Sequence, residues 1–214
     1  MEIYQTDEEQ VDAIKEWWDQ NGKSVIVGLV IVLGSVFGWN KWNEHQQGLS
    51  ASASSRYEMM MAQVEKDPDG AVAMGESLKQ EFKGSHYSVL AAMMTAKIEV
   101  DRGQLEIAAA ELSWAAEQSG NPIFVDLANS RLARVILAQG RADDALAMLA
   151  KVKSESFSGI VAEIEGDAYI SQGDRTKARG AYQKALAGYA DTPNKRSLVQ
   201  IKLDDLNEVL PTKM

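Results

Sequence analysis

The longest apolar stretch of the chain lies near its N-terminus, between Lys23 and Lys41. Residues 24–40 carry no charged side chain and consist mainly of valine, isoleucine, leucine and glycine. As an α-helix these roughly 17 residues reach about 25 Å, close to the ~30 Å hydrocarbon core of a bilayer. The pattern predicts a transmembrane helix over 24–40 rather than a buried element of a soluble core. It also argues against a cleaved signal peptide, because the preceding residues are acidic where a signal peptide is basic.

Side chains typical of a membrane–water boundary flank this stretch. Tryptophan rings prefer the level of the lipid headgroups, and lysine can extend its ammonium group from the membrane edge into water. Basic residues do not orient the span, because Lys15 and Lys23 precede it while Lys41 and Arg56 follow it. The candidate interface anchors are Trp17, Trp18, Lys23, Trp39 and Trp42.

Small residues recur one helical turn apart inside the span. Gly34 and Gly38 form a small-xxx-small pair, and Ser24 with Gly28 repeats the spacing. Such pairs let a second membrane helix approach closely, although glycine is also simply tolerated in membrane helices. The candidate helix-packing residues are therefore Gly28, Gly34 and Gly38.

Residues 1–23 form an acidic tail, with seven acids against two lysines in a chain of net charge −9. Thr6 and Glu9 have the spacing of a capping box, and Val11, Ile14 and Trp18 form a narrow apolar stripe. The pattern predicts a short amphipathic helix that leads into the membrane. Its acidic face either meets a basic protein surface or is simply solvated.

Helical periodicity after the span predicts an all-α fold. A serine- and alanine-rich run at 50–55 indicates a connector over 41–56, followed by a helical domain over 57–214. Glycines and prolines divide this domain into helix pairs with short breaks. The expected helices are 57–66, 69–83, 85–100, 104–118, 122–139, 141–153, 157–172, 174–190 and 195–210.

Glycines at the expected turns are each followed five residues later by an alanine, which suits a close helix crossing. The last helix pair has the most specific pattern, that of a tetratricopeptide repeat, although Glu165 stands where leucine is usual and the closing Pro193 comes late. The pattern predicts a degenerate tetratricopeptide-like array of about four helix pairs with a C-terminal capping helix. The glycine–alanine pairs are Gly103 with Ala108, Gly140 with Ala145 and Gly173 with Ala178, and the repeat signature is Gly166, Tyr169, Gly173, Ala178, Tyr182 and Ala185.

The composition excludes several kinds of chemistry. The chain has no cysteine and two histidines, His45 and His86, which lack the spacing of a metal site. It has no glycine-rich phosphate loop and no nucleophile elbow. Its acidic balance does not suit nucleic acid, because phosphate neutralisation needs clustered lysine and arginine. We expect no catalytic residue, no metal and no cofactor.

Methionines cluster in the first half of the helical domain. Methionine fills irregular gaps in protein cores, and it also forms adaptable surfaces that accept varied apolar segments. The cluster is therefore either core or a candidate groove for a partner or client. Its members are Met59, Met60, Met61, Met93 and Met94.

Three segments of the chain resemble the YfgM family. They are the acidic stretch 7–24, the motif Phe-Gly-Trp-Asn-Lys-Trp at 37–42 and the motif Ile-Lys-Leu-Asp-Asp-Leu at 201–206. The resemblance spans the whole chain and implies an ancillary subunit of the bacterial SecYEG translocon. It further implies a single pass through the inner membrane, with the N-terminus in the cytoplasm and the repeat domain in the periplasm.

The resemblance also implies partners: the translocon, the membrane-anchored periplasmic chaperone PpiD, and newly exported, unfolded proteins that are passed to periplasmic chaperones. These expectations describe an adaptor in the lipid bilayer rather than an enzyme, and stacked helix pairs suit this role because they form extended concave surfaces. The alternative is a membrane-tethered scaffold for an envelope assembly or cell-wall machine, with no client contact.

Overall fold

The computed structural model describes residues 7–206 of the chain. Within this range the structure consists of α-helices and one short 3-10 helix, with no strand, which confirms the all-α prediction. Contacts divide the chain into two units, Met1–Leu49 and Ser50–Met214. Each unit is described by itself.

The first unit contains most of α1, Asp7–Gln63. Apolar side chains between Val25 and Trp39 are exposed around the whole helix. A helix that is apolar all round is typical of a membrane span. The apolar stretch is long enough to cross a bilayer, as the sequence predicts for 24–40.

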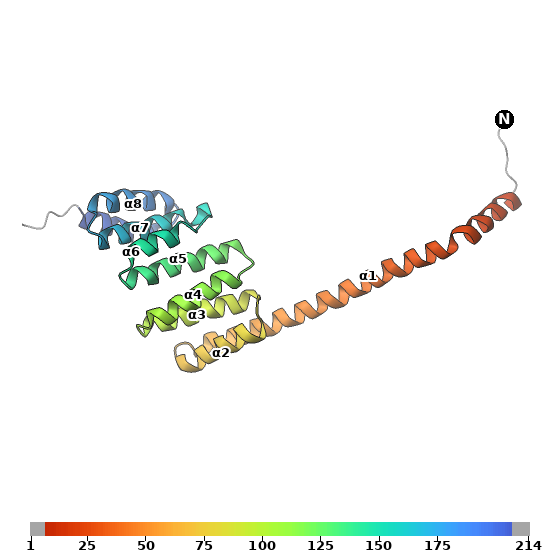
Figure 1. The fold of residues 1–214 in the computed structure, drawn as a ribbon, viewed down its shortest axis with the longest axis horizontal. Coiled ribbons are helices and arrows are strands. Elements are labelled where there is room, and N and C mark those ends of the chain that lie inside the picture. The colour runs from red at the N-terminus through yellow and green to blue at the C-terminus, as the bar shows by residue number, and fades with distance from the viewer. Residues whose placement is uncertain (1–6, 207–214) are drawn as a thin grey trace, which may run out of the picture. The chain divides into compact units, whose positions relative to one another are not determined.

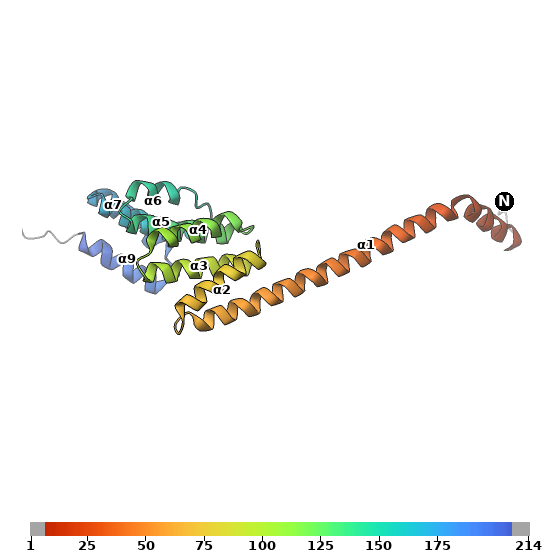
Figure 2. The same ribbon diagram turned by 60° about the horizontal axis from the view of Figure 1, so that its bottom comes forward.

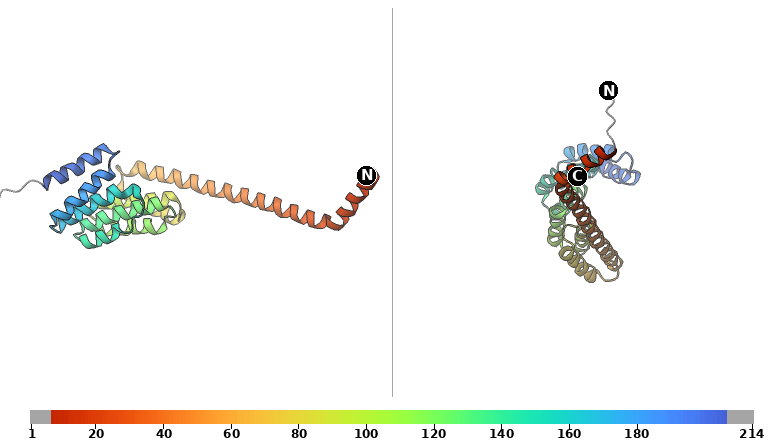
Figure 3. Two further views of the ribbon diagram at one scale, coloured as in Figure 1. Left: turned by 90° about the horizontal axis from the view of Figure 1, so that it is seen from above. Right: turned by 90° about the vertical axis from the view of Figure 1, so that its right-hand side faces the viewer.

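The N-terminal part of α1 is continuous with the span, so residues 7–23 of the tail and the membrane segment share one helix. Figure 3 shows that this first part bends away from the rest of the helix. In this part the Asn21 side-chain amide donates a hydrogen bond to the backbone oxygen of Trp17, 2.9 Å away. A side chain that competes for an i−4 carbonyl is a common cause of a bend. The predicted cap at Thr6 lies outside the described residues.

The second unit, called the repeat unit below, begins inside α1, at Ser50 rather than at residue 57. The serine- and alanine-rich run over 50–55 is helical, and no break interrupts 41–56. Ala53 is fully buried in one cluster with Ala71 and Leu78 of the next helix. The small side chains that suggest a joint therefore serve a close helix contact, and alanine favours the helix intrinsically.

The remaining helices form antiparallel neighbours stacked in chain order (Figures 1 and 2). Each contacts the next one along the chain. Each predicted helix has a counterpart, although 57–66 is the end of α1 and 141–153 shortens to eight residues that end at Leu149. Residues 207–210 of the predicted helix 195–210 lie outside the described residues. The helices are α2 Pro68–Glu81, α3 His86–Asp101, α4 Leu105–Gln118, α5 Pro122–Ala138, α6 Ala142–Leu149, η1 Glu155–Phe157, α7 Ser158–Ser171, α8 Arg175–Gly188 and α9 Pro193–Asp205.

The turns that close three of the hairpins share one geometry. Gly103, Gly140 and Gly173 have φ of 75°, 79° and 78°, in the left-handed region where glycine carries no penalty. The residue after each glycine donates its N–H to a carbonyl five positions earlier, as in Gln104 to Glu99 at 2.8 Å. This is a Schellman cap, which satisfies the last carbonyls of the helix. The predicted turns are therefore repeated structural units.

Alanines fill the places where the helices cross. Ala108, Ala145 and Ala178, each expected at a crossing, are fully buried. The methyl group of alanine is small enough for two helix backbones to approach closely, and it still buries apolar surface. The core of the repeat unit is accordingly rich in alanine between larger residues such as Leu112 and Ile164.

Candidate functional site

The repeat unit has a depression along its alternate helices α3, α5 and α7, of which α5 contacts both α3 and α7. It consists of two cavities of ≈ 410 Å³ and ≈ 310 Å³ that share Arg131 and Arg134 on α5. We call the pair the inner groove. The larger cavity also involves Met93, Met94, Ala96, Lys97, Val100, Leu112 and Val135. The smaller one also involves Leu127, Ser130, Ile160, Glu163, Lys195 and Leu198.

The larger cavity is mainly apolar. Met94 is half-buried there, and Val100 on α3 is 40% exposed. Lys97 lies one turn before Val100 and forms an ion pair with Asp101, with Nζ 2.7 Å from Oδ2. The α3 side of the groove therefore presents apolar side chains next to a lysine whose charge is already paired.

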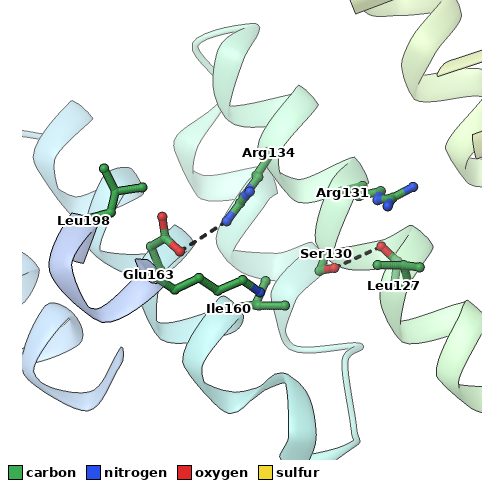
Figure 4. Close-up of a pocket in the computed structure, with 8 residues that line it drawn as sticks. Leu127, Ser130, Arg131, Arg134, Ile160, Glu163 and Leu198 are labelled. Carbon is green, nitrogen blue, oxygen red and sulfur yellow. Dashed lines mark hydrogen bonds and ion pairs between the residues drawn. The ribbon is translucent and has the colours of Figure 1, made fainter. Parts of the chain in front are cut away.

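Arg131 and Arg134 project from one face of α5 because residues three apart lie together on a helix surface. The two guanidinium groups point in different directions, Arg134 towards Glu163 and Arg131 away from it (Figure 4). Arg134 Nη2 lies 3.3 Å from Glu163 Oε2. Within residues 7–206 Arg131 has no acidic partner. Partial burial, together with the charge of Arg134, lowers the pKa of Arg131 from its ordinary value despite the opposing effect of Tyr57.

Glu163 on α7 is a buried carboxylate at the smaller cavity. Its Oε1 accepts a hydrogen bond from Lys202 Nζ of α9 at 2.9 Å, and its Oε2 accepts one from Tyr189 Oη at 2.7 Å. Burial raises the pKa of Glu163, but these bonds and the charges of Lys202 and Arg134 outweigh it and lower the pKa overall. Glu163 is therefore ionised at neutral pH and ties α5, α8 and α9 to α7.

A second carboxylate extends this network. Lys202 Nζ also lies 2.8 Å from Asp167 Oδ2, and Tyr182 Oη donates a hydrogen bond to Asp167 Oδ1 at 2.7 Å. Burial, then the bond to Asp167, raises the pKa of Tyr182. The phenol therefore stays protonated. The capping helix α9 is thus held by buried polar contacts as well as by Val199, which is fully buried.

Comparison with known proteins shows which family has this architecture. The family described as a tetratricopeptide repeat-like domain matches residues 15–208. A protein of Escherichia coli (strain K12), called Ancillary SecYEG translocon subunit, is 33% identical over 207 residues, 97% of this chain and 100% of its own length. Proteins of the same name from Haemophilus influenzae and Aggregatibacter actinomycetemcomitans are 30% and 35% identical, over 94% of this chain and 97% of their own lengths.

The chain belongs to the family of ancillary SecYEG translocon subunits. Membership confirms the resemblance seen in the sequence and agrees with an α1 that can span a membrane once. Within the part of the chain that the structure describes, no three histidine or acidic side chains are grouped to hold a metal ion.

The repeat signature of this family member has structural roles. Ala178 and Ala185 are fully buried, Gly173 forms a turn, and Tyr169 lies under Lys177, whose Nζ is 5.5 Å from the ring centroid. Gly166 faces Tyr182 so closely that a Cβ there would lie 2.3 Å from the ring. The signature residues therefore build the last helix pair, and Tyr169 also lines a surface cavity of ≈ 340 Å³.

The methionines separate into core and surface. Met60 and Met93 are 0% and 2% exposed and belong to two different core clusters. Met59 and Met61 are exposed on α1 and do not line the inner groove, whereas Met94 and the buried Met93 do. A single methionine groove is therefore not formed, because successive residues on a helix point in different directions.

The predicted membrane residues lie on an open helix surface. Nothing lies within 4 Å of a Cβ built at Gly28, Gly34 or Gly38, so this surface remains free for a partner helix. The rings of Trp39 and Trp42 pack together at the end of the span, with centroids 5.4 Å apart and planes tilted by 42°. The other anchors, Trp17, Trp18 and Lys23, are likewise exposed, as residues that face headgroups would be.

Sequence reasoning did not single out the inner groove. Arg131 and Arg134 are a one-turn pair of arginines in a largely apolar helix, and Glu163 is an acid between Ala162 and Ile164. The one signal in the sequence was Glu163, a charged residue at a core position of an apolar run. What these three residues face is set by helices about 30 residues apart, which helix periodicity does not specify.

Proposed function

We propose that this protein is an inner-membrane adaptor of the Sec translocon that binds a periplasmic chaperone and helps to pass newly exported proteins to it. The inner groove carries the proposal. It is a concave, partly apolar surface on a repeat unit whose first helix continues into a membrane-length apolar stretch. Relatives named as ancillary translocon subunits support the Sec part of the proposal.

In this proposal the acidic tail 1–23 lies in the cytoplasm, residues 24–40 cross the inner membrane, and the repeat domain lies in the periplasm. The described residues contain one helix apolar enough to cross a membrane, and a single crossing places the tail and the repeat domain on opposite sides. The exposed surface of Gly28, Gly34 and Gly38 would then dock a helix of the translocon or of the chaperone, because small residues allow close approach in lipid.

The groove suits transient binding rather than chemistry. Its two cavities are open at the surface, and the one buried acid that lines it, Glu163, is already paired with Lys202 and Arg134. Partly apolar surfaces of this kind hold a partner by burial and complementary charge. An adaptor that hands its cargo on needs such reversible contact.

Site-directed photo-cross-linking in native membranes tests the proposal. A photoreactive residue is placed at Gly34, at Val100 in the groove, or at Gln183, which is exposed on α8 away from the groove. We expect Gly34 to capture translocon or chaperone helices, and Val100 to capture the chaperone or exported chains. Gln183 should capture neither. Capture of only cell-wall enzymes, or of no Sec component at Gly34 and no chaperone or exported chain at Val100, would refute the proposal.

A further inference from the structure

The inner groove has a charge opposite to that of the chain. The chain carries a net charge of −9. Four cations line the groove, Lys97, Arg131, Arg134 and Lys195, whereas Glu163 is the one acid among its lining residues. A basic groove on an acidic protein attracts anionic partners and repels cationic ones.

Two of these cations have no carboxylate of their own. Asp101 pairs with Lys97 and Glu163 pairs with Arg134. For the side chains that the structure describes, neither Arg131 nor Lys195 has an ion-pair partner. Lys195 Nζ instead lies 5.3 Å from the ring centroid of Tyr189. Both free cations therefore remain available to a ligand.

Apolar side chains lie on both sides of Arg131. Met94 and Val100 belong to the larger cavity on one side, and Ile160 and Leu198 belong to the smaller cavity on the other. Val100 and Leu198 are 40% and 52% exposed, so a partner that covers them gains hydrophobic burial. Arginine binds carboxylates through two parallel hydrogen bonds, and exclusion of water strengthens such a pair.

We propose that the inner groove recognises a protein segment in which acidic side chains are flanked on both sides by apolar ones. This inference rests on the proposed adaptor function and names the chemistry of the segment that the adaptor binds. A carboxylate of the segment pairs with Arg131 where the two cavities meet. Its apolar side chains enter the cavities, and a further acid reaches Lys195. Segments that are neutral or basic at the central position are rejected.

The test uses the full-length chain in native membranes. A photoreactive residue at Val100 or at Leu198 captures the bound segment, and mass spectrometry identifies the cross-linked peptide. Capture is compared among the wild type, Arg131→Glu, Arg131→Lys and Lys195→Glu. Lys83→Glu is the matched charge reversal, because Lys83 is exposed in the turn after α2 and does not line the groove. Thermal melting of each variant checks that the fold is intact.

We expect the captured segments to be acidic with apolar flanks. Arg131→Glu should reduce capture about tenfold, because it replaces an attraction with a repulsion. Lys195→Glu should reduce it less, Arg131→Lys should retain most of it, and Lys83→Glu should change it little. Neutral or basic segments, a second copy of this chain, no captured segment, or equal capture by Arg131→Glu and Lys83→Glu would overturn the inference.

A second photoreactive residue at Gly34 in the same variants separates this inference from the adaptor function. If Gly34 captures translocon or chaperone helices while the groove captures neutral segments, the adaptor function stands and the charge rule falls. If Gly34 captures no Sec component and the groove holds neither a chaperone nor an exported chain, the adaptor function falls, whatever the charge of the segment in the groove.

Discussion

The close contact between Gly166 and Tyr182 can be tested by comparing the effect of Gly166→Ala on stability with that of Gly180→Ala in the neighbouring helix. In a helix interior, Gly→Ala normally stabilises by about 1 kcal/mol, because alanine has the higher helix propensity. Gly180 on α8 meets this condition, since nothing lies within 4 Å of a Cβ built there. We therefore expect Gly180→Ala to stabilise the repeat unit by about 0.5–1 kcal/mol.

At Gly166 the sign should reverse. A Cβ there would lie 2.3 Å and 2.4 Å from Cε1 and Cδ1 of Tyr182. The ring must therefore retreat by about 1 Å to reach ordinary contact. Tyr182 is 3% exposed, so it has little space to move, and its hydroxyl is fixed by the 2.7 Å bond to Asp167.

The energies can be combined. Overpacking costs about 1–3 kcal/mol, and a weakened hydrogen bond to a carboxylate adds about 1–2 kcal/mol. After the propensity gain of about 1 kcal/mol, these ranges leave about 1–4 kcal/mol, and the middle of that range, about 2.5 kcal/mol, is the destabilisation expected for Gly166→Ala. In urea unfolding of the full-length chain in detergent micelles, followed by circular dichroism, the midpoint should fall by about 1–1.5 M.

A double-mutant cycle isolates the cause. In a Tyr182→Leu background the ring is absent, so adding Gly166→Ala should cost little or should stabilise. The argument is refuted if Gly166→Ala and Gly180→Ala shift the midpoint equally. It is also refuted if the cost of Gly166→Ala persists without the ring of Tyr182.

Three further predictions concern the polar contacts and the turns. Because the pKa of Glu163 is lowered by folding, its stabilising effect is present above about pH 4.5 and is lost as the pH falls through the folded-state value. In urea unfolding from pH 7 to pH 3, the free energy of unfolding should therefore depend less on pH for Glu163→Gln than for the wild type. The variant should also be less stable by about 2 kcal/mol at pH 7. Parallel pH profiles of the two proteins would contradict this. Asp126→Ala should cost about 2–3 kcal/mol, because two backbone N–H groups, at Lys153 and Ser154, lose their acceptor; Asp126→Asn keeps one acceptor and should cost less in the same assay. Alanine at Gly103, Gly140 or Gly173 should cost about 1 kcal/mol in each case, and unequal midpoint shifts would show that the three turns are not equivalent.

The elements of the fold are largely predictable from the sequence. Gly173 followed by Ala178 predicts a turn and a close crossing, because both effects depend on the local backbone and on side-chain size. The span over 24–40 is predictable for the same reason, since length and apolarity alone decide it. The run at 50–55 shows the limit, because serine and alanine suit both a connector and a tightly packed helix until the neighbouring helix is known.

The inner groove is less predictable because it depends on which distant residues meet. Glu163 and Lys202 are 39 positions apart and become partners only when α9 packs onto the last helix pair, α7 and α8. Met60 and Met94 look alike in the sequence, yet Met60 is fully buried and Met94 lines the groove. Their difference comes from the rotation of each helix against its neighbours.

The position of Glu163 joins the stability of the repeat unit to its proposed binding surface. The same carboxylate pairs with Lys202 of the capping helix and with Arg134 of the groove. Because Glu163 already neutralises Arg134, a carboxylate that enters the groove is attracted more strongly to Arg131 than to Arg134. Glu163→Gln would release Arg134 as a further unpaired cation. Among the described residues, Glu163 therefore leaves Arg131, where the two cavities meet, and Lys195 of the smaller cavity as the unpaired cations of the groove.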